Sequence, residues 1–276
     1  MADDFDKIRR GNYTLYIHRN FRNEKLEEAL TKGKEKLQQL YKLAAVESSK
    51  FARVYQFTMK FNEADKTVYL KQYLSRSVID LIKHLVRRSR ARRAFIAKQM
   101  LKKNGFEAPA IIAMGERKCS FFTTDNFLLT LEVENAKQIY EIIPNIVSNL
   151  TSEQLRDKRE WLRALGRTVG RMHKVGIFHG DMRIGNVLGQ KSKDGRQFFF
   201  LDNERTRKFR RLPYRLRVRN LVQLNMHPKN TLTNSDRIRF FKEYRAENKN
   251  SKSKENRLIK RVVKLTGRRL RKKGIY

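Results

Sequence analysis

The sequence predicts an α+β fold with two lobes, an N-terminal antiparallel sheet with an inserted helix and a mainly helical C-terminal part. Short runs in which apolar and polar residues alternate recur up to residue 131, and this is the period of half-buried strands. Longer runs with helical spacing dominate from residue 132 onward. Because no Pro-rich or Gly/Ser-rich linker separates the halves, we expect residues 1–131 and 132–276 to form two lobes of one unit.

The composition is typical of a folded cytoplasmic protein. The chain has 276 residues, 39% of them hydrophobic and only four of them proline, which is enough for a sizeable core. No apolar run approaches the roughly 20 residues that a membrane span needs, and the acidic N-terminus lacks the layout of a signal peptide. The single cysteine, Cys119, excludes an internal disulfide and fits a reducing compartment.

The first 75 residues predict a strand, a helix and a hairpin. Alternation over Tyr13–Ile17 predicts a short strand, and leucines at helical spacing predict an amphipathic helix over Glu24–Leu43. The strongest signal is a hairpin: a strand over Tyr55–Phe61, a turn over residues 62–66 and a return strand over Thr67–Tyr73.

Lys71 lies among apolar and aromatic residues of that return strand. Burying an ammonium group is costly unless an anion meets it. A lysine at this position is therefore unusual, and an anion that contacts it would explain it. An edge or solvent-facing lysine in a lysine-rich chain is the alternative interpretation.

The rest of the N-terminal half predicts a helix and two more strands. Ser77–Asp80 has the pattern of a capping box that opens a helix, and helical spacing continues to a stop at Gly105. Strands are expected over Ala110–Met114 and Phe127–Leu131, with a turn at Thr124–Asn126. The half therefore amounts to a five- or six-stranded antiparallel sheet with one or two helices inserted after the lysine strand.

The C-terminal half begins with a clear helix and a hairpin. Apolar residues three, four and three apart predict a helix over Ser152–Lys174, which Gly176 ends. A short strand at Val187–Leu188, a turn over residues 192–195 and an apolar strand over Gln197–Leu201 follow. Further helices are expected in the basic remainder, among them Ser235–Glu247.

Between that helix and that hairpin stands a polar loop, Phe178–Leu188. Its polar residues include His179, Asp181, Arg183 and Asn186. An Asp followed five residues later by an Asn is the spacing of a phosphoryl-transfer loop, in which the Asp orients the attacking hydroxyl and the Asn holds Mg²⁺. Such a loop requires a second metal-binding acid downstream, and Asp202 follows the apolar strand. A polar surface turn explains the loop alone, but not the ordered set of Lys71, loop and Asp202.

These residues have separable expected roles. Asp181 orients the acceptor hydroxyl, and Arg183 stabilises the charge that builds on the γ-phosphate of ATP. Lys71 pairs with the α- and β-phosphates. Asn186 and Asp202 contact the nucleotide through Mg²⁺, which prefers hard oxygen ligands. The expected cofactors are therefore ATP and Mg²⁺.

In these motifs the chain resembles the lipopolysaccharide core kinase family, the Kdo and heptose kinases of Gram-negative bacteria, within the wider protein-kinase-like fold. Val68–Tyr73, Phe178–Leu188 and Phe198–Thr206 carry the resemblance, which extends over roughly residues 46–244. It implies an ATP-dependent kinase whose acceptor is a sugar hydroxyl of the lipopolysaccharide core or of a related anionic glycolipid. It also implies that His179 braces the loop.

Three departures from the kinase pattern change what is expected of the nucleotide site. Asp202 is followed by Asn-Glu in place of Phe-Gly, so we expect no activation switch of the usual kind. Residues 46–61 contain no glycine, so the phosphates would be held by Ser48, Ser49 and the backbone. Glu132 and Val133, where the strand pattern ends, are further expected nucleotide contacts.

The third departure is a missing carboxylate. No acid lies between Asp80 and Glu107, so the inserted helix lacks the glutamate that pairs with the strand lysine in kinases. Lys71 is then held either by Asp202 or by the nucleotide alone.

The charge is extreme, with 64 Lys and Arg against 28 Asp and Glu, a formal net charge of +36. Arg205–Arg219 holds eight cations and no acid, and Lys249–Tyr276 holds twelve cations and one acid. Such segments attract anionic lipid headgroups, which indicates a peripheral position on the inner face of the cytoplasmic membrane. A solubilising or partly disordered tail is the alternative.

Two rival functions stay open at the level of sequence. The first, within the same fold, is an atypical protein kinase or a small-molecule phosphotransferase. The second is a basic nucleic-acid-binding protein or a pseudokinase that acts as a binding module. The charge supports the second, but the chain lacks the interleaved basic and aromatic residues of known nucleic-acid modules.

Overall fold

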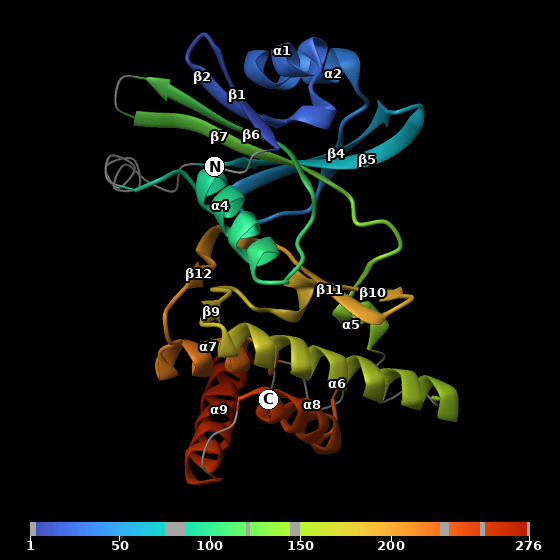
Figure 1. Cartoon of the computed structure of the whole chain (residues 1–276), viewed down its shortest axis with the longest axis vertical. Helices are drawn as coiled ribbons and strands as arrows, with labels where there is room; N and C mark the ends of the chain where they lie inside the picture. Colours follow the sequence, from blue (N-terminus) through green and yellow to red (C-terminus); the bar gives the residue numbers. More distant parts are fainter. Residues whose placement is uncertain are drawn as a thin grey trace. The chain divides into compact units, whose positions relative to one another are not determined.

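A computed structural model describes residues 4–74, 87–119, 122–143, 150–226, 232–248 and 252–274 (Figure 1). The chain folds into two compact units, one of residues 1–99 and 109–134 and one of residues 100–108 and 135–276. The first is built on an antiparallel sheet and the second is mainly helical, so the α+β prediction is confirmed. The lobe boundary after residue 131 stays a prediction.

The first unit is built on one sheet of seven strands within the described residues. In chain order these are β1 (Phe5–Arg10), β2 (Tyr13–His18), β3 (Ala44–Val46), β4 (Ala52–Phe61), β5 (Ala64–Tyr73), β6 (Ile111–Cys119) and β7 (Phe122–Leu131). Their spatial order is β1-β2-β6-β7-β5-β4-β3, and all neighbours are antiparallel. Neither β1 nor β3 was predicted, because both are edge strands without a fully buried residue and without apolar alternation.

Helices cover both faces of this sheet (Figure 1). They are α1 (Glu24–Lys32), α2 (Lys34–Leu40) and α4 (Arg90–Lys103). Leu15 and Ile17 of β2 pack in the cluster under α1 and α2, and Tyr16 between them packs in the cluster under α4. The helix predicted over Glu24–Leu43 is two helices, because Gly33 has a φ of 99° that interrupts the helical backbone.

The predicted hairpin is confirmed as β4 and β5, joined by Asn62 and Glu63, which both have positive φ. The turn predicted at Thr124–Asn126 is wrong, because these residues lie inside β7. Their polar side chains serve other elements: Asp125 accepts a hydrogen bond from the Tyr13 hydroxyl at 2.6 Å, and Asn126 accepts one from the backbone of α4. The predicted capping box at residues 77–80 lies outside the described residues.

The second unit is organised around a long helix. Its helices are α5 (Ile139–Ile142), α6 (Ser152–Lys174), α7 (Tyr214–Leu224), α8 (Asn234–Glu247) and α9 (Lys252–Lys272). The bounds of α6 are those predicted. Thr151 caps it, since the Thr151 hydroxyl accepts from the Gln154 amide at 3.2 Å and the Gln154 side chain accepts from the Thr151 amide at 2.9 Å. Its apolar face, which includes Trp161 and Leu165, fills the core of the unit.

Two glycines of α6 let α8 pack closely against it. A Cβ on Gly166 would lie 2.4 Å from the Phe240 carbonyl oxygen, and a Cβ on Gly170 would lie 2.9 Å from that of Tyr244. No side chain fits at either distance. The α6–α8 contact therefore depends on glycine at both positions.

Short strands frame the polar loop. They are β8 (Lys137–Gln138), β9 (Ile177–Phe178), β10 (Val187–Ser192), β11 (Gly195–Phe200) and β12 (Arg207–Lys208). The 3₁₀ turns η2 (Ile184–Asn186) and η3 (Asn203–Arg205) lie in the same region. Another 3₁₀ turn, η1 (Arg19–Phe21), follows β2 in the first unit. The predicted hairpin is β10 with β11, to which β8 adds an edge. Since β9 pairs with β12, the chain before the loop lies beside the chain after η3.

Candidate active site

The polar loop starts at His179, which is fully buried and whose backbone amide and carbonyl are both hydrogen-bonded. The His179 amide donates to Asn220 Oδ1 of α7 at 3.2 Å, and its carbonyl accepts from the Thr206 hydroxyl at 2.9 Å. Burial lowers the pKa of His179 to about 4, although the nearby Asp181 and Asp202 carboxylates oppose this shift. A neutral, buried imidazole fits the bracing role expected of His179.

Gly180 follows in a conformation that only glycine adopts easily. Its φ is 85°, and a Cβ there would lie 2.5 Å from the Arg205 Cβ and 2.7 Å from the Arg205 carbonyl oxygen. The loop therefore passes directly over the segment that follows Asp202, with no room for a side chain.

Asp181 and Arg183 form a two-pronged ion pair. Arg183 Nε and Nη2 donate to the two Asp181 carboxylate oxygens at 2.9 and 2.8 Å. The Arg183 side chain is 63% exposed and that of Asp181 21% exposed. This hydrogen bond, together with the charge of Asp181, raises the pKa of Arg183. Gln223 Nε2 lies 3.5 Å from Asp181 Oδ1, so the carboxylate is oriented from α7 as well.

The side-chain nitrogen of Asn186 is fixed by a hydrogen bond, which leaves its side-chain oxygen for another partner. Its Nδ2 donates to the Asp181 carbonyl at 2.9 Å, which orients Oδ1 away from that contact. The Leu201 amide donates to the Asn186 carbonyl at 2.9 Å, so Asp202 comes directly after a residue paired with Asn186. Asp202 has φ 58° and ψ 47°, a left-handed conformation that is uncommon outside glycine and collects at functional sites.

The segment after Asp202 is buried and hydrogen-bonded, unlike an activation loop. Asn203 Nδ2 donates to the Phe200 carbonyl at 2.6 Å, and the Thr206 hydroxyl contacts Asn203 Oδ1 at 3.2 Å. Since Thr206 also bonds to His179, the segment that stands in place of Phe-Gly joins the polar loop to the end of β11.

A polar network that the sequence analysis missed supports the loop from below. His173 of α6 contacts the Tyr244 hydroxyl at 2.9 Å through Nδ1 and Asn220 Oδ1 at 3.2 Å through Nε2. Burial lowers the pKa of His173 to about 3, so it is neutral. Asn220 and Gln223 stand among the buried apolar residues of α7 (Val218, Leu221, Val222 and Leu224), and polar residues within such an apolar run are the signal that identifies them.

In the first unit, Lys71 lies on β5 between β4 and β7. Its register partners are Val54 and Leu128, so the lysine is on an inner strand as predicted. Lys71 Nζ lies 5.3 Å from the centre of the Tyr73 ring, and the side chain is half-buried. Of the two alternatives, the edge position is excluded, whereas half burial does not exclude a lysine that faces solvent.

Ser48 and Ser49 lie on the exposed connection between β3 and β4. The Ser48 hydroxyl donates to the Ala52 carbonyl at 2.8 Å, and the Ala52 amide donates to the Ser49 carbonyl at 2.9 Å. The connection is thus a hydrogen-bonded turn without glycine.

Arg90, the first residue of α4, was not predicted and holds this turn. The Arg90 side chain is buried, its Nη1 donates to the Phe51 carbonyl at 2.8 Å, and its guanidinium lies 4.8 Å from the centre of the Tyr73 ring. Tyr73 therefore has Lys71 and Arg90 both within cation–π range. One arginine among many in this sequence gives no signal by itself.

The helix that follows is acid-free, as the sequence requires, and is fixed to the sheet in another way. Glu116 of β6 is buried, accepts a hydrogen bond from the Ser89 hydroxyl at 2.5 Å and pairs with Arg92 at 3.3 Å. The N-terminus of α4 is therefore anchored to β6 and β7 within its own unit.

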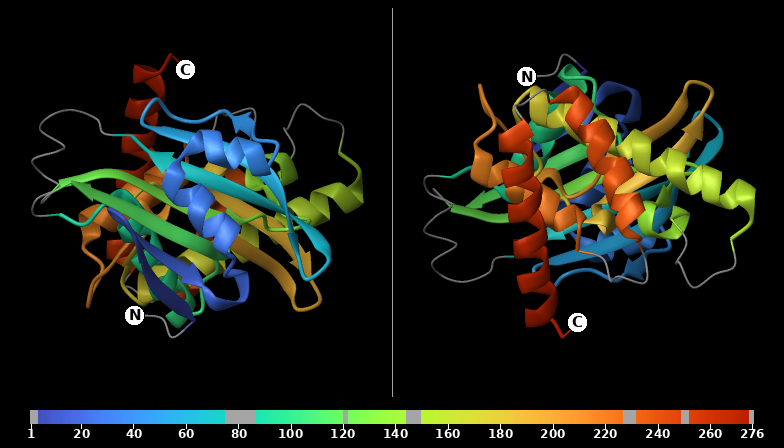
Figure 2. Two further views of the ribbon diagram at one scale, coloured as in Figure 1. Left: turned by 90° about the horizontal axis from the view of Figure 1, so that it is seen from above. Right: turned by 90° about the horizontal axis from the view of Figure 1, so that it is seen from below.

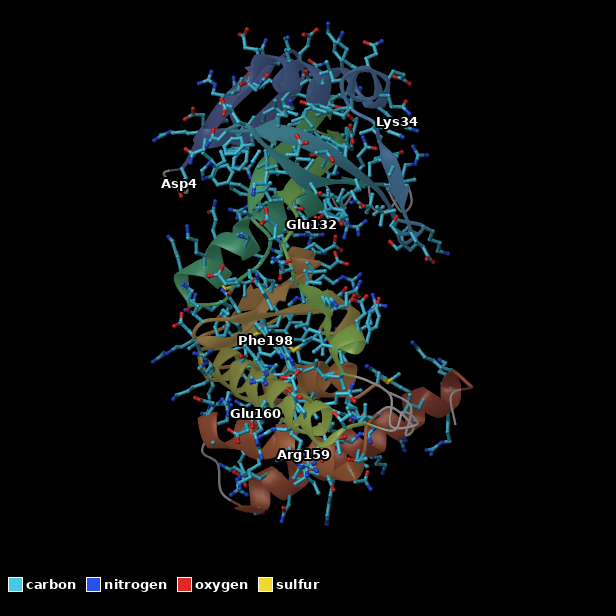
Figure 3. The ribbon with its side chains drawn as sticks, turned by 90° about the vertical axis from the view of Figure 1, so that its right-hand side faces the viewer. Asp4, Lys34, Glu132, Arg159, Glu160 and Phe198 are labelled. Atoms are coloured by element: carbon cyan, nitrogen blue, oxygen red, sulfur yellow. The ribbon has the colours of Figure 1, made fainter. Side chains whose placement is uncertain are left out.

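Glu132 and Val133 come directly after β7. The Glu132 amide donates to the Thr67 carbonyl at 2.9 Å, and its carboxylate accepts from the Tyr69 hydroxyl at 3.0 Å (Figure 3 labels Glu132). Burial and this hydrogen bond raise the pKa of Tyr69 to about 12. The end of the strand is thereby tied to β5, two residues from Lys71.

The donor atoms fit Mg²⁺ better than a tightly bound transition metal. Among the described residues no group of three His, Cys, Asp or Glu side chains gathers as a metal site. Asn186 and Asp202 supply two oxygen donors from neighbouring backbone segments, and Mg²⁺ commonly takes one or two protein oxygens beside water and substrate phosphates.

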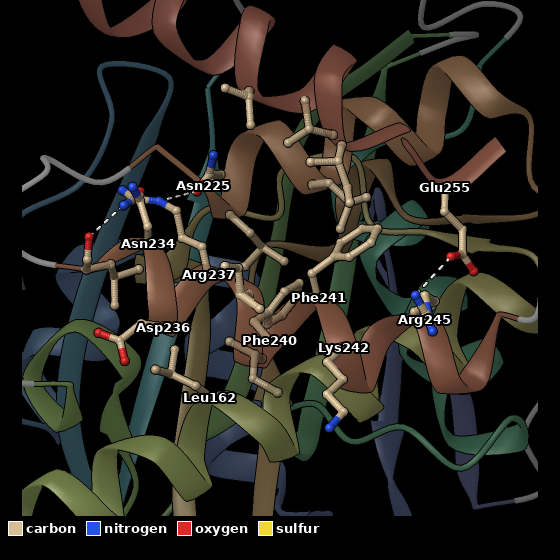
Figure 4. A pocket seen from close by; sticks show the side chains of 18 of the residues that line it. Leu162, Asn225, Asn234, Asp236, Arg237, Phe240, Phe241, Lys242, Arg245 and Glu255 are labelled. Carbon is tan, nitrogen blue, oxygen red and sulfur yellow. Dashed lines mark hydrogen bonds and ion pairs between the residues drawn. The ribbon is translucent and has the colours of Figure 1, made fainter. Parts of the chain in front are cut away.

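A separate apolar cavity of about 780 Å³ lies in the second unit, between α6, α7, α8 and α9 (Figure 4). Its walls include Leu165, Leu221 and Phe241, with Arg237 and Lys242 among the few charges. Of the polar loop only Ile184 reaches it, so the carboxylates and amides described above lie outside this cavity.

Comparison with known proteins shows to which family the chain belongs. The sequence profile of the lipopolysaccharide kinase (Kdo/WaaP) family matches residues 36–244. The chain belongs to this family. Membership in the Kdo/WaaP family implies kinase activity and the use of ATP.

The fold agrees. A solved structure described as WaaP in complex with acyl carrier protein superposes with a TM-score of 0.65 at 18% sequence identity, over 92% of this chain and 98% of that one. No curated protein matches the sequence.

Within this Kdo/WaaP kinase, the predicted residues fall into two sets. The structure brings Asp181, Arg183, Asn186 and Asp202 together in the second unit. In the first unit, Lys71 and the turn of Ser48 and Ser49 flank β4, while Glu132 and Val133 follow β7. Their roles in binding and catalysis remain predictions. None of the helices within the described ranges combines the length and the hydropathy of a membrane span.

Proposed function

We propose that this protein transfers the γ-phosphoryl group of ATP, with Mg²⁺, to a sugar hydroxyl of the lipopolysaccharide inner core. Kdo or heptose, or the sugar of a related anionic glycolipid, is the acceptor. The observation that carries the proposal is the Asp181 carboxylate, which is fixed by Arg183 and followed by Asn186 and Asp202 on hydrogen-bonded neighbouring segments.

The reaction needs a hydroxyl oxygen to attack the γ-phosphorus while the bond to the β,γ-bridging oxygen breaks and ADP leaves. Asp181 orients the hydroxyl and accepts its proton. Arg183 is mostly exposed, so its guanidinium is free to turn from the carboxylate toward the γ-phosphate and stabilise the charge that develops there.

Asn186 and Asp202 would hold Mg²⁺ through Oδ1 of the amide and the carboxylate oxygens. When bound, the ion would offset the negative charge of the phosphates. The fixed amide of Asn186 keeps its oxygen available for this task.

For the nucleotide, we propose that Lys71 binds the α- and β-phosphates and that Ser48, Ser49 and the backbone of their turn cover them. Glu132 and Val133 contact the base where the chain leaves β7. The half-buried position of Lys71 on an inner strand supports this, because an anion offsets the cost of burying its ammonium group.

The proposed acceptor is a membrane lipid, so the enzyme would act at a membrane. A core glycolipid is embedded by its acyl chains, so we propose a cytoplasmic protein attached peripherally to the inner face of the cytoplasmic membrane. The formal net charge of +36 supports attraction to that anionic surface.

Labelled ATP with a panel of purified core glycolipids and oligosaccharides tests the acceptor. We expect Mg²⁺-dependent label on an inner-core sugar, and none on acceptors that lack Kdo and heptose. Label on protein substrates or on small hydroxylated molecules instead would indicate an atypical protein kinase or a small-molecule phosphotransferase.

The rival of another class is a basic nucleic-acid-binding protein or a pseudokinase that acts as a binding module. Calorimetry with ATP and Mg²⁺ separates it from a kinase. Failure to bind ATP, together with tight and salt-sensitive binding of nucleic acid, would contradict the kinase proposal.

The WaaP structure contains an acyl carrier protein, so we also propose an acyl carrier protein as a partner of this chain. Co-purification of the two tagged proteins checks this. Separate elution in gel filtration at micromolar concentration would argue against it.

A further inference from the structure

The helix α9 is charged on one side and packed on the other. Leu258 belongs to the core of the second unit, with Val262 and Leu265 packed against it. Asn225, the residue that follows α7, donates to the Thr266 hydroxyl at 3.2 Å. The helix packs against α7, and the view from below shows it in red, running to the C-terminus (Figure 2, right). Over Lys252–Lys272 the basic tail is a helix packed on the second unit, so the alternative of a partly disordered tail does not hold there.

The only acid of α9 is turned inward. Glu255 is buried and pairs with Arg245 of α8 at 3.3 Å, as Figure 4 shows. Its charge is therefore neutralised within the protein and does not reduce the positive field outside.

The outward side of α9 is cationic along its whole length. Its exposed cations are Lys254, Arg257, Lys260, Arg261, Lys264, Arg268, Arg269, Arg271 and Lys272. At 1.5 Å per residue, a helix of 21 residues is about 30 Å long, which spans several lipid headgroups.

Exposed aliphatic side chains accompany these cations. Ile259 is 38% exposed and Val263 60% exposed, one turn apart. Both also line the apolar cavity of the second unit, so they lie at its open edge, and each is followed directly by an exposed lysine. Aliphatic residues at the border of a cationic face are typical of helices that lie in a lipid interface. Surfaces for single-stranded nucleic acid use aromatic side chains that stack on bases, and α9 contains none; a duplex, which is bound through its phosphates, is therefore the comparison in the test.

We infer that the outer face of α9 docks this protein on an anionic membrane surface. The cations contact the headgroups, and Ile259 and Val263 enter the boundary between headgroups and acyl chains. The inference rests on the proposed function only for its purpose, which is to hold the active site at the layer that contains a glycolipid acceptor. The binding itself is measured without turnover.

The first experiment removes four cations from the middle of the face. The variant Lys260→Gln, Arg261→Gln, Lys264→Gln, Arg268→Gln keeps good helix formers and touches no residue of the active site. Co-sedimentation with phosphatidylcholine vesicles that contain phosphatidylglycerol is compared with pure phosphatidylcholine. Each cation near such a surface contributes about fivefold in affinity, so we expect a loss of roughly several hundredfold in the variant.

The matched control removes the same charge elsewhere in the second unit. Arg156, Arg159, Arg171 and Lys193 are exposed cations on α6 and on the β10–β11 turn (Figure 3 labels Arg159). Their replacement by Gln should leave vesicle binding close to that of the wild type. Equal losses in the two variants, or no loss in either, would refute α9 as the docking face.

A second variant separates membrane from soluble polyanion. Val263→Ser removes an exposed methyl pair and no charge, so it should weaken vesicle binding severalfold and leave binding of a DNA duplex unchanged. A wild-type protein that binds the duplex more tightly than the vesicles, with Val263→Ser altering neither, would identify α9 as a nucleic-acid surface.

Kinase activity on a delipidated, water-soluble core oligosaccharide is the separate readout for the proposed function. The four-cation variant should phosphorylate it like the wild type. A protein without any kinase activity that still binds vesicles through α9 would contradict the proposed function and leave the docking inference in place.

Discussion

The ion pair between Asp181 and Arg183 is the smallest feature on which the account depends. Both Asp181 oxygens accept from one guanidinium, and that guanidinium is mostly exposed. The carboxylate is therefore oriented before any substrate arrives. A substrate phosphate would compete with it for the same cation.

Replacing that cation gives the first prediction. Arg183→Ala should lower kcat by about 10²-fold or more, because charge on the transferring phosphoryl group loses its cationic partner. The KM for ATP should change much less. Steady-state kinetics measures both, with the exposed Arg210→Ala as a control for loss of one charge. An unchanged kcat would remove Arg183 from the chemistry.

The buried histidines give a pH prediction. The folded pKa of His173 is about 3 and that of His179 about 4, both below the ordinary value of 6.5. Between pH 6.5 and about 4 the unfolded chain binds protons that the folded chain does not, so stability falls as pH falls through this range. Each histidine contributes a slope approaching about 1.4 kcal/mol per pH unit.

Urea unfolding from pH 6.5 to 5 measures this slope, with His173→Gln as the comparison. The variant should be less stable at pH 6.5 but show a shallower decline toward pH 5. A slope identical to that of the wild type would mean that His173 is protonated in the folded protein.

At the scale of elements, the contact between α6 and α8 holds the platform under the loop. Gly166 and Gly170 allow the close approach, and Tyr244 of α8 reaches His173 at the end of α6. Displacing α8 would move this support, so helix packing and loop geometry are linked through one hydroxyl.

The same substitution at two helical glycines tests this. Gly166→Ala should destabilise the protein by about 1–3 kcal/mol, because the added Cβ would overlap the Phe240 carbonyl and outweigh the gain in helix propensity. Gly267→Ala in α9 has only Arg271 Nη1 at 3.7 Å, so it should stabilise by up to about 1 kcal/mol. Thermal unfolding of both variants measures these changes in stability. A Gly166→Ala variant as stable as the wild type would contradict the described packing.

Elements with strong local patterns were predictable, and those defined by distant contacts were not. The bounds of α6 follow from its apolar spacing and its Thr151 cap, and the β4–β5 hairpin follows from alternation. Asp125 and Asn126 misled because polar residues inside a strand resemble a turn until their partners across the sheet are known. Arg90 was not predicted because its partners, Phe51 and Tyr73, lie far from it along the chain.

For the whole molecule, the order of the motifs along the chain carried the functional prediction. A lysine strand, an Asp-to-Asn loop and a following Asp predicted a kinase-like site, and the Kdo/WaaP family match and fold agree with it. The inward orientation of Glu255 and the docking of α9 could not be predicted, because composition describes how many charges a helix has and not where they point.

The most direct test is mass spectrometry of a purified inner-core glycolipid after incubation with the protein, ATP and Mg²⁺. The account predicts one added phosphoryl group on a Kdo or heptose residue and one ADP for each, with turnover reduced at least about 10³-fold in Asp181→Asn. ATP binding and folding should persist in that variant. Transfer by Asp181→Asn at the wild-type rate, or ATP hydrolysis without any phosphorylated sugar, would contradict it.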